Sequence, residues 1–211
     1  MNGKRIPEGT ISRLFIYLRE VAELARNNIR TVSSAELGER ANLSDAQVRK
    51  DLGYFGQFGV SGSGYDTVEL QKALQKILGK DRTWNVAVIG AGQLGAALVQ
   101  YTGFAEHGLE VVALFDSDPG KIGRQIGGIK VQSVEELNRS TGSKRLAIGI
   151  IAVPAEAAQE VAGRMVQAGI GCILNFAPVG LNVPETVKVK NVDLSHELET
   201  LSYFLVNQGK K

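Results

Sequence analysis

The chain has 211 residues, of which 44% are hydrophobic and 22% charged, and its formal net charge is +2. This length suits one large domain or two small ones, and the composition is ordinary for a soluble globular protein. No apolar run is long enough to span a bilayer, and residues 1–10 lack the apolar region of a signal peptide, so we expect a cytoplasmic protein with no membrane partner.

Residues 7–28 are predicted to form a first helix, because apolar residues recur there at spacings of three and four. A short extended piece over 31–33 follows, and then a helix over 35–41 capped by Ser34. Asn42 and Leu43 turn the chain, and Ser44 caps a further helix over 45–55. Two short helices around a tight turn have the plan of a helix-turn-helix.

The second helix of this motif is the one that normally enters the major groove of DNA. Gln47 and Arg49 can make bidentate contacts to base edges, whereas Lys50 is better suited to phosphate. The glycine-rich stretch over 56–65 is predicted to form a wing, with a surface hairpin as the alternative, and a solvated helix face is the alternative for Arg49 and Lys50. The candidate DNA-binding residues are Ser44, Gln47, Arg49, Lys50, Tyr54, Ser61 and Gly62.

A helix over 67–78 closes this domain, and 79–83 is interpreted as a linker. Residues 86–89 form an unbroken apolar run, which is typical of a strand buried on both faces of a parallel sheet. The GAGQLG stretch over 90–95 follows and fits GxGxxG, in which the first glycine permits a tight turn, the second lets the backbone approach a pyrophosphate, and the third lets the helix pack closely. A purely structural turn is the alternative.

A second strand over 111–115 ends at Asp116, about 20 residues beyond the last glycine of the motif. This spacing suits a carboxylate that accepts hydrogen bonds from the adenosine ribose and repels a 2′-phosphate, which favours NAD(H) over NADP(H). A solvated loop acid is the alternative interpretation of Asp116.

Strands and helices alternate in the rest of the chain. A turn-rich loop over 119–128 is followed by a strand over 129–131, a helix capped by Ser133, a strand over 146–153, a helix over 155–168, and strands over 173–176 and 187–192. This order predicts an α/β fold with a Rossmann-type doubly wound parallel sheet, which binds ligands at the carboxyl ends of its strands. Val153, Pro154, Phe176, Ala177 and Pro178 lie at such ends and would form an apolar wall around a nicotinamide.

Neither a catalytic site nor a metal site is predicted. Cys172 lies in an apolar run and is expected to be buried, and with His107 and His196 alone no Cys/His zinc site can be assembled. A dehydrogenase would need a proton relay beside the nicotinamide, yet no Tyr-x-x-x-Lys pair follows the glycine motif. A CoA-binding module is a further alternative, which Asp116 argues against.

The last helix is predicted to be capped by Ser195 and to carry Leu198, Leu201, Phe204 and Leu205 on one side. This apolar face must be covered either by the sheet of its own chain or by a second subunit.

With both motifs identified, the chain closely resembles the Rex family of redox-sensing transcriptional repressors along its whole length. The matching stretches are ISRLFIYLR, QVRKDLGYFGQFG, VIGAGQLGAAL, FDSDPGKIG, VPAEAAQ, NFAPV and NVDL. The resemblance implies a homodimer that exchanges the terminal helix over 195–206. It also implies that NADH holds a closed dimer unable to fit its palindromic, A·T-rich operator, whereas the NAD+-bound or free protein binds DNA and blocks genes of anaerobic or fermentative NADH reoxidation.

The resemblance further implies an interdomain switch made of Arg19, Tyr101 and Asp193, and this chain has Leu194 where relatives carry a phenylalanine. Because NAD+ carries a cationic nicotinamide and NADH a neutral one, we expect an apolar pocket to prefer NADH. The candidate cofactor-binding residues are Gly90, Gly92, Gln93, Leu94, Gly95, Tyr101, Asp116, Val153, Pro154, Ala177 and Pro178. The expected domains are a winged helix over 1–80, an NAD(H)-binding domain over 81–193, and a swapped helix and tail over 194–211.

Overall fold

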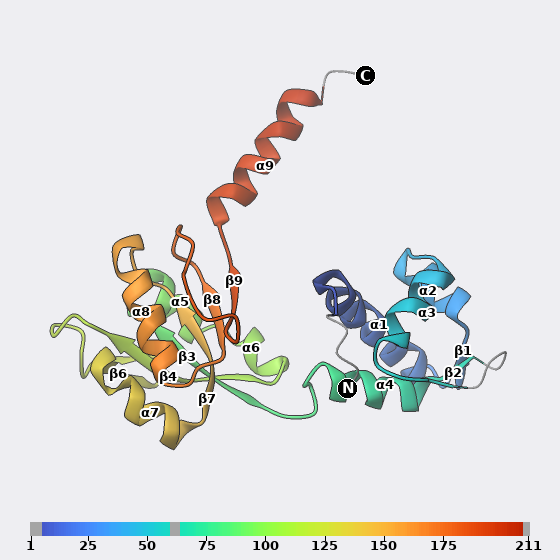
Figure 1. The fold of residues 1–211 in the computed structure, drawn as a ribbon, viewed down its shortest axis with the longest axis horizontal. Coiled ribbons are helices and arrows are strands. Elements are labelled where there is room, and N and C mark those ends of the chain that lie inside the picture. The colour runs from blue at the N-terminus through green and yellow to red at the C-terminus, as the bar shows by residue number, and fades with distance from the viewer. Residues whose placement is uncertain (1–5, 60–63, 209–211) are drawn as a thin grey trace. The chain divides into compact units, whose positions relative to one another are not determined.

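The computed structural model of the chain describes residues 6–59 and 64–208. The chain divides into two compact units, residues 1–82 and residues 83–211 (Figure 1). Residues 60–63, which include the predicted DNA-binding residues Ser61 and Gly62, lie outside the described residues.

The first unit consists, in its described part, of a helical core with a small two-stranded sheet. Its elements are α1 Glu8–Arg26, β1 Thr31–Val32, α2 Ser34–Ala41, α3 Asp45–Gly53, β2 Tyr65–Asp66 and α4 Thr67–Ile77, with β1 and β2 antiparallel. The side chains that form the core come from all four helices, and Leu14, Leu37, Val48 and Leu74 are completely buried. The helix-turn-helix predicted from the sequence is therefore present as α2 and α3.

One predicted cap of this unit is wrong. The residue that caps α2 is Ser33, whose hydroxyl accepts a hydrogen bond from the backbone of Glu36 at 3.1 Å, while the Glu36 carboxylate accepts one from the Ser33 backbone at 3.4 Å. Ser34 lies inside the first turn, because only Ser33 has a glutamate three residues later. Ser44 caps α3 as predicted, and α3 ends at Gly53, two residues earlier than expected.

The second unit is a Rossmann-type sheet with helices on both faces. Its elements are β3 Trp84–Ile89, α5 Gln93–Val99, α6 Gly103–Glu106, β4 Leu109–Asp116, β5 Gln125–Ile126, β6 Ile129–Ser133, η1 Val134–Glu136, α7 Leu137–Lys144, β7 Leu146–Ile151, α8 Ala155–Gln167, β8 Cys172–Asn175, β9 Lys188–Asn191 and α9 Leu194–Asn207. The strand order is β5-β6-β4-β3-β7-β8-β9, and all neighbours are parallel except β5 and β6. The order of the strands reverses at β3.

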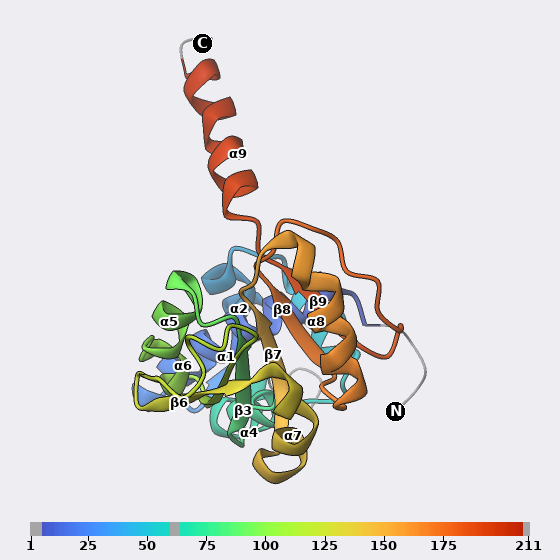
Figure 2. The same ribbon diagram turned by 90° about the vertical axis from the view of Figure 1, so that its left-hand side faces the viewer.

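Both faces of this sheet are covered, which explains the unbroken apolar strands. Ala87 and Ile89 of β3 belong to the core shared with α7 and α8, whereas Val86 and Val88 belong to the core on the side of α5 and α6. Figure 2 shows α7 and α8 on one side of the strands and α5 and α6 on the other. Because side chains alternate along a strand, the covered part of β3, residues 86–89, has apolar residues at every position.

Two further expectations differ from the structure. The predicted loop over 119–128 contains β5, which pairs with β6 through a turn at Gly127 and Gly128, both with positive φ. Cys172 is exposed instead of buried, because it is the first residue of β8 and its neighbour Ile173 takes the position that points into the core. No helix in residues 6–59 and 64–208 is both long and apolar enough to cross a membrane.

Candidate functional site

The second unit has a crevice at the carboxyl ends of β3, β4 and β7, where the strand order reverses. Its volume of about 510 Å³ is in the range of small-molecule sites. The residues that line it are Ile89, Gly90, Gly92, Gln93, Leu94, Asp116, Ser117, Asp118, Lys121, Val134, Ala152, Val153, Pro154, Ala157 and Val161. The structure thus brings together most of the predicted cofactor residues. It also adds Lys121, which was not predicted because a single charged residue in a loop is not a distinctive signal in the sequence.

The glycines of the motif between β3 and α5 have different roles. Gly90 has a φ of +106°, and a Cβ there would collide with the backbone oxygen of Ala152. A Cβ at Gly95 would collide with the backbone oxygen of Gly90, so Gly95 is needed for close packing of α5 on β3 and does not line the crevice. A Cβ at Gly92 would meet nothing within 4 Å, which leaves the backbone open on the crevice side.

Asp116 ends β4 and is almost completely buried, with 7% of its surface exposed. Its carboxylate accepts hydrogen bonds from the backbone of Ala91 at 2.7 Å, from the backbone of Asp118 at 2.8 Å and from Lys121 Nζ at 3.0 Å. Burial alone would raise the pKa of Asp116, but these donors outweigh it and hold the pKa below its ordinary value. Asp116 is therefore an ionised group fixed in the crevice, and not a solvated loop acid.

The apolar wall is only partly where it was predicted. Val153 and Pro154 line the crevice, whereas Ala177 and Pro178 do not; Ala177 is buried and Pro178 is exposed. Ala177 is held by Asn175, a completely buried side chain that accepts from the Ala177 backbone at 3.0 Å and donates to its carbonyl oxygen at 3.2 Å. An asparagine at the end of an apolar strand was the signal for this arrangement in the sequence.

The predicted switch residues lie in both units. Arg19, in α1 of the first unit, has a side chain that is 73% exposed and donates to its neighbour Glu20 at 3.0 and 3.1 Å. In the second unit, Tyr101 is 60% exposed, packs edge-to-face against Phe104, and is outside the crevice lining.

Asp193 is the residue that caps α9, and the predicted cap Ser195 lies inside the helix. The carboxylate of Asp193 accepts hydrogen bonds from the backbones of Ser195 and His196 at 3.0 and 3.1 Å. None of the α9 side chains is buried.

On α3, the exposed side carries Arg49 and Lys50, and Tyr54 follows the helix half-buried. Arg49 Nη1 donates to Asp45 at 2.7 Å and to the hydroxyl of Ser34 at 3.0 Å. Arg49 also lines a groove between α3 and the described ends of the glycine-rich stretch, together with Gln57, Phe58, Gly59, Gly64 and Tyr65. A basic side chain thus lies where α3 meets the described ends of the glycine-rich stretch.

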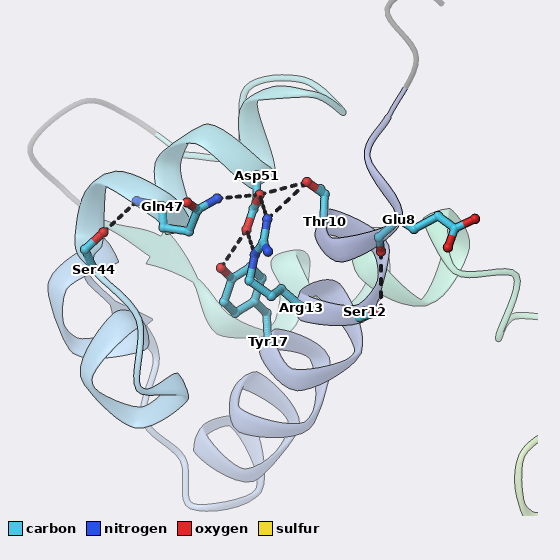
Figure 3. A network of polar contacts seen from close by, with 8 residues as sticks. All are labelled: Glu8, Thr10, Ser12, Arg13, Tyr17, Ser44, Gln47 and Asp51. Atoms are coloured by element: carbon cyan, nitrogen blue, oxygen red, sulfur yellow. Dashed lines mark hydrogen bonds and ion pairs between the residues drawn. The ribbon is translucent and has the colours of Figure 1, made fainter. Parts of the chain in front are cut away.

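Sequence reasoning missed a polar network centred on Asp51, which is completely buried on the inner side of α3 (Figure 3). Asp51 accepts from Arg13 Nε at 2.6 Å and Nη2 at 2.7 Å, from Tyr17 at 2.9 Å, from Thr10 at 3.0 Å, and from Gln47 at 2.9 Å. Burial raises the pKa of Asp51, but the hydrogen-bond donors outweigh burial and lower this pKa below its ordinary value. Burial also raises the pKa of Tyr17. The signal was an acid in line with the apolar positions Val48 and Leu52.

No group of three or more His, Cys, Asp and Glu side chains in the part of the chain that the structure describes is arranged to hold a metal ion.

The chain is similar to known proteins over its whole length. Residues 5–53 match a protein-family model described as "Putative DNA-binding protein N-terminus", and residues 81–179 match one described as "CoA binding domain". The chain is 48% identical over 210 residues to the redox-sensing transcriptional repressor Rex of Desulforamulus reducens, and the match covers 100% of both chains. Among solved structures, it is similar to RSP in complex with β-NAD+ and operator DNA, with a TM-score of 0.88 and 39% identity over 98% of this chain and 95% of that one. It is also similar to RSP in complex with β-NADH, with a TM-score of 0.80 and 37% identity over 98% and 97% of the two chains.

Proposed function

The chain belongs to the Rex family of redox-sensing transcriptional repressors, and from this premise we propose that it binds operator DNA with its first unit and leaves it when NADH occupies the crevice of its second unit. Its family consists of transcriptional repressors, not enzymes. The observation that carries the proposal is the crevice at the end of β3, where an open glycine backbone and an ionised, buried carboxylate line one cavity.

Three parts of a dinucleotide match three parts of this crevice. Gly92 offers a backbone that a pyrophosphate can approach, and Asp116 offers a carboxylate for the adenosine ribose hydroxyls. Val153 and Pro154 form an apolar surface at the end of β7, which suits the neutral nicotinamide of NADH better than the cationic ring of NAD+. Both NADH and NAD+ are ligands of this site in our proposal, and NADH is the one that releases DNA.

The CoA alternative has one observation in its favour, the family model that matches residues 81–179. Asp116 argues against it, because a buried carboxylate in the crevice repels the additional phosphate that CoA carries on its ribose. Competition measured at this site distinguishes the two ligands, since CoA should displace NADH only if the alternative is correct.

The operator-binding surface in this proposal is α3 with the glycine-rich stretch after it. Arg49 and Lys50 are exposed on α3, and Ser44, Gln47, Tyr54, Ser61 and Gly62 complete the predicted set. A palindromic operator requires two such surfaces, so the proposal includes a homodimer.

The dimer would form through α9. Its large apolar side chains are all more than half exposed, and soluble proteins rarely leave an apolar surface of this kind uncovered. These side chains are Leu194, Leu198, Leu201, Tyr203, Phe204, Leu205 and Val206. The second subunit is the proposed cover, with Arg19, Tyr101 and Asp193 as the residues that transmit cofactor binding to the DNA-binding units. The proposed domains are residues 1–80, 81–193 and 194–211. The proposed location is the cytoplasm, because an operator-binding protein must reach the DNA there.

A gel-shift titration of the full-length protein on a palindromic, A·T-rich duplex tests the proposal. We expect a retarded complex in the absence of cofactor and with NAD+, and its loss as NADH is added. A complex that is insensitive to NADH, or no complex with any duplex, would refute the proposed function.

A further inference from the structure

The side-chain amide of Gln47 is held in one orientation by the buried carboxylate of Asp51 (Figure 3). Gln47 Nε2 donates to Asp51 Oδ1 at 2.9 Å, across one turn of α3. The oxygen and nitrogen of a glutamine amide have nearly the same size, so shape alone does not decide which of them faces a neighbour. A carboxylate accepts hydrogen bonds and cannot donate them, so only the nitrogen of Gln47 fits against Asp51.

Asp51 cannot turn away and release Gln47, because α1 holds it from the other side. Arg13 donates to both carboxylate oxygens, at 2.6 and 2.7 Å, and Tyr17 donates to Oδ2 at 2.9 Å. Thr10 donates to Oδ1, the same oxygen that Gln47 uses, at 3.0 Å. The side chain of Asp51 has no exposed surface, and its low pKa keeps it ionised at neutral pH.

The carbonyl oxygen of Gln47 is therefore the group left for a partner outside the protein. Every buried side-chain oxygen or nitrogen in residues 6–59 and 64–208 has a hydrogen-bond partner. The Gln47 oxygen accepts no hydrogen bond from the described residues, so it must be reached by solvent. It lies in the N-terminal half of α3, the half that enters the major groove in helix-turn-helix proteins.

We propose that Asp51 is a positioning residue for operator reading, which holds Gln47 with its carbonyl oxygen outward so that it contacts an exocyclic amine of a base. In the major groove the amines are adenine N6 and cytosine N4, whereas guanine O6 and thymine O4 are acceptors. The second hydrogen of the Gln47 amide remains available for adenine N7, so adenine satisfies both groups. This inference rests on the proposed function, because it concerns how α3 reads DNA.

The first experiment removes the amines from the DNA one at a time. The duplex is selected with the full-length wild-type protein from a library of randomised palindromes. Each adenine is then replaced by purine and each cytosine by pyrimidin-2-one, which lack the exocyclic amine. At one position of each half-site we expect amine removal to lower the affinity of the wild type about tenfold more than that of Gln47→Ala. The alanine variant corrects for the effect of each analogue on base pairing.

The second experiment changes the carboxylate. In Asp51→Asn the new amide can donate to the Gln47 oxygen, so Gln47 can turn its nitrogen outward. We expect this variant to lose the amine dependence and to shift its base preference at that position towards guanine or thymine. Tyr17→Phe is the matched control, because it removes one hydrogen bond from Asp51 but leaves the carboxylate facing Gln47. It should keep the wild-type base preference, whatever stability it loses.

The outcomes separate the inference from the proposed function. If no amine removal affects the wild type more than Gln47→Ala, or if a folded Asp51→Asn variant keeps the wild-type base preference, the inference is overturned while NADH-sensitive binding stands. If thermal unfolding shows that Asp51→Asn does not fold, the comparison of the wild type with Gln47→Ala decides alone. Failure of the wild type to bind any duplex would instead refute the proposed function.

Discussion

Each of the two units contains one buried aspartate carboxylate, Asp51 in the first and Asp116 in the second. Each lies among donors from its own unit, and each has a pKa below its ordinary value of 3.8 despite burial. The same physical arrangement has two uses. Asp116 keeps its charge in the crevice of the second unit, whereas Asp51 keeps its charge inside the helical core of the first.

Replacing Asp116 should change which cofactor the crevice accepts. Asp116→Ala removes the acceptor proposed for the ribose hydroxyls, and each charge-assisted hydrogen bond contributes about 1.5–3 kcal/mol, so NADH should bind roughly tenfold to a hundredfold more weakly. NADPH should lose less or gain, because Lys121 would no longer be paired with a carboxylate. Calorimetric titration with both cofactors measures this. Glu110→Ala, on the exposed side of the same strand, is the control, and an unchanged preference for NADH over NADPH would contradict the ribose role.

Asp51 should make the first unit sensitive to acid. A carboxylate whose pKa is lowered by folding stabilises the folded state at pH values above its unfolded pKa, near 4, and this stabilisation is lost as the pH falls through the lower folded pKa. We expect the thermal unfolding temperature of the wild type to fall more steeply between pH 5 and pH 3 than that of Asp51→Asn. Glu69→Gln, which removes an exposed carboxylate from α4, should follow the wild type. Parallel curves for wild type and Asp51→Asn would show that the network is not ionised as described.

At the scale of elements, the turn between β3 and α5 separates stability from binding. A Cβ at Gly95 would collide with the Gly90 backbone, so Gly95→Ala should push α5 away from β3 and destabilise the unit by about 1–3 kcal/mol. A Cβ at Gly92 would meet no protein atom but would stand where the pyrophosphate approaches. We therefore expect Gly92→Ala to unfold at the wild-type temperature and to bind NADH weakly. The reverse result, a stable Gly95→Ala and an unstable Gly92→Ala, would contradict this assignment.

The elements could be predicted from the sequence where one local signal was sufficient. Apolar runs located the buried strands, and the three- and four-residue spacing located α1. Prediction failed where two neighbours offered the same signal, since Ser33 and Ser34 are both good caps and only the capping box with Glu36 distinguishes them. It also failed for Cys172, because an apolar run does not reveal where a strand begins to be covered.

The site could be predicted only as far as local sequence determines it. The glycine motif and Asp116 have a characteristic spacing in the sequence, and both contribute to the lining of the crevice. The contact between Asp51 and α1 joins positions that are 34 to 41 residues apart, and nothing in a single sequence pairs them. Ala177 and Pro178 do follow a strand of the same sheet, but β8 is separated from β3 by β7, which leaves them outside the lining.

At the scale of the whole molecule, α9 should control the oligomeric state. Leu198 and Leu205 are 68% and 70% exposed and share one side of the helix, so a second subunit would bury them. Leu198→Glu combined with Leu205→Glu should convert a dimer to monomers in sedimentation velocity, with both units still folded. His196→Glu adds the same type of charge on the opposite side of α9 and should leave the dimer intact. A double variant that sediments like the wild type would exclude α9 from the interface.

The proposed dimer must couple two ligands, and Arg19 is the residue through which we expect the coupling to pass. Its side chain is 73% exposed and bonded only to Glu20 among the described partners. The Glu20 side chain is only 11% exposed, but it keeps a second cation, Arg40 Nη1 at 3.9 Å, so we expect Arg19→Ala to fold. Linkage requires NADH to weaken operator binding by the same factor by which operator weakens NADH binding, and a near-complete switch requires about 5 kcal/mol. In Arg19→Ala we expect both separate affinities to stay within a few-fold of wild type while this factor falls towards one. Arg26→Ala, an exposed arginine on the same helix, should keep the factor. Fluorescence anisotropy of labelled operator at increasing NADH measures this linkage factor. If Arg19→Ala has the same linkage factor as the wild type, Arg19 is not part of the switch, and of the proposed switch residues only Tyr101 and Asp193, both in the second unit, remain.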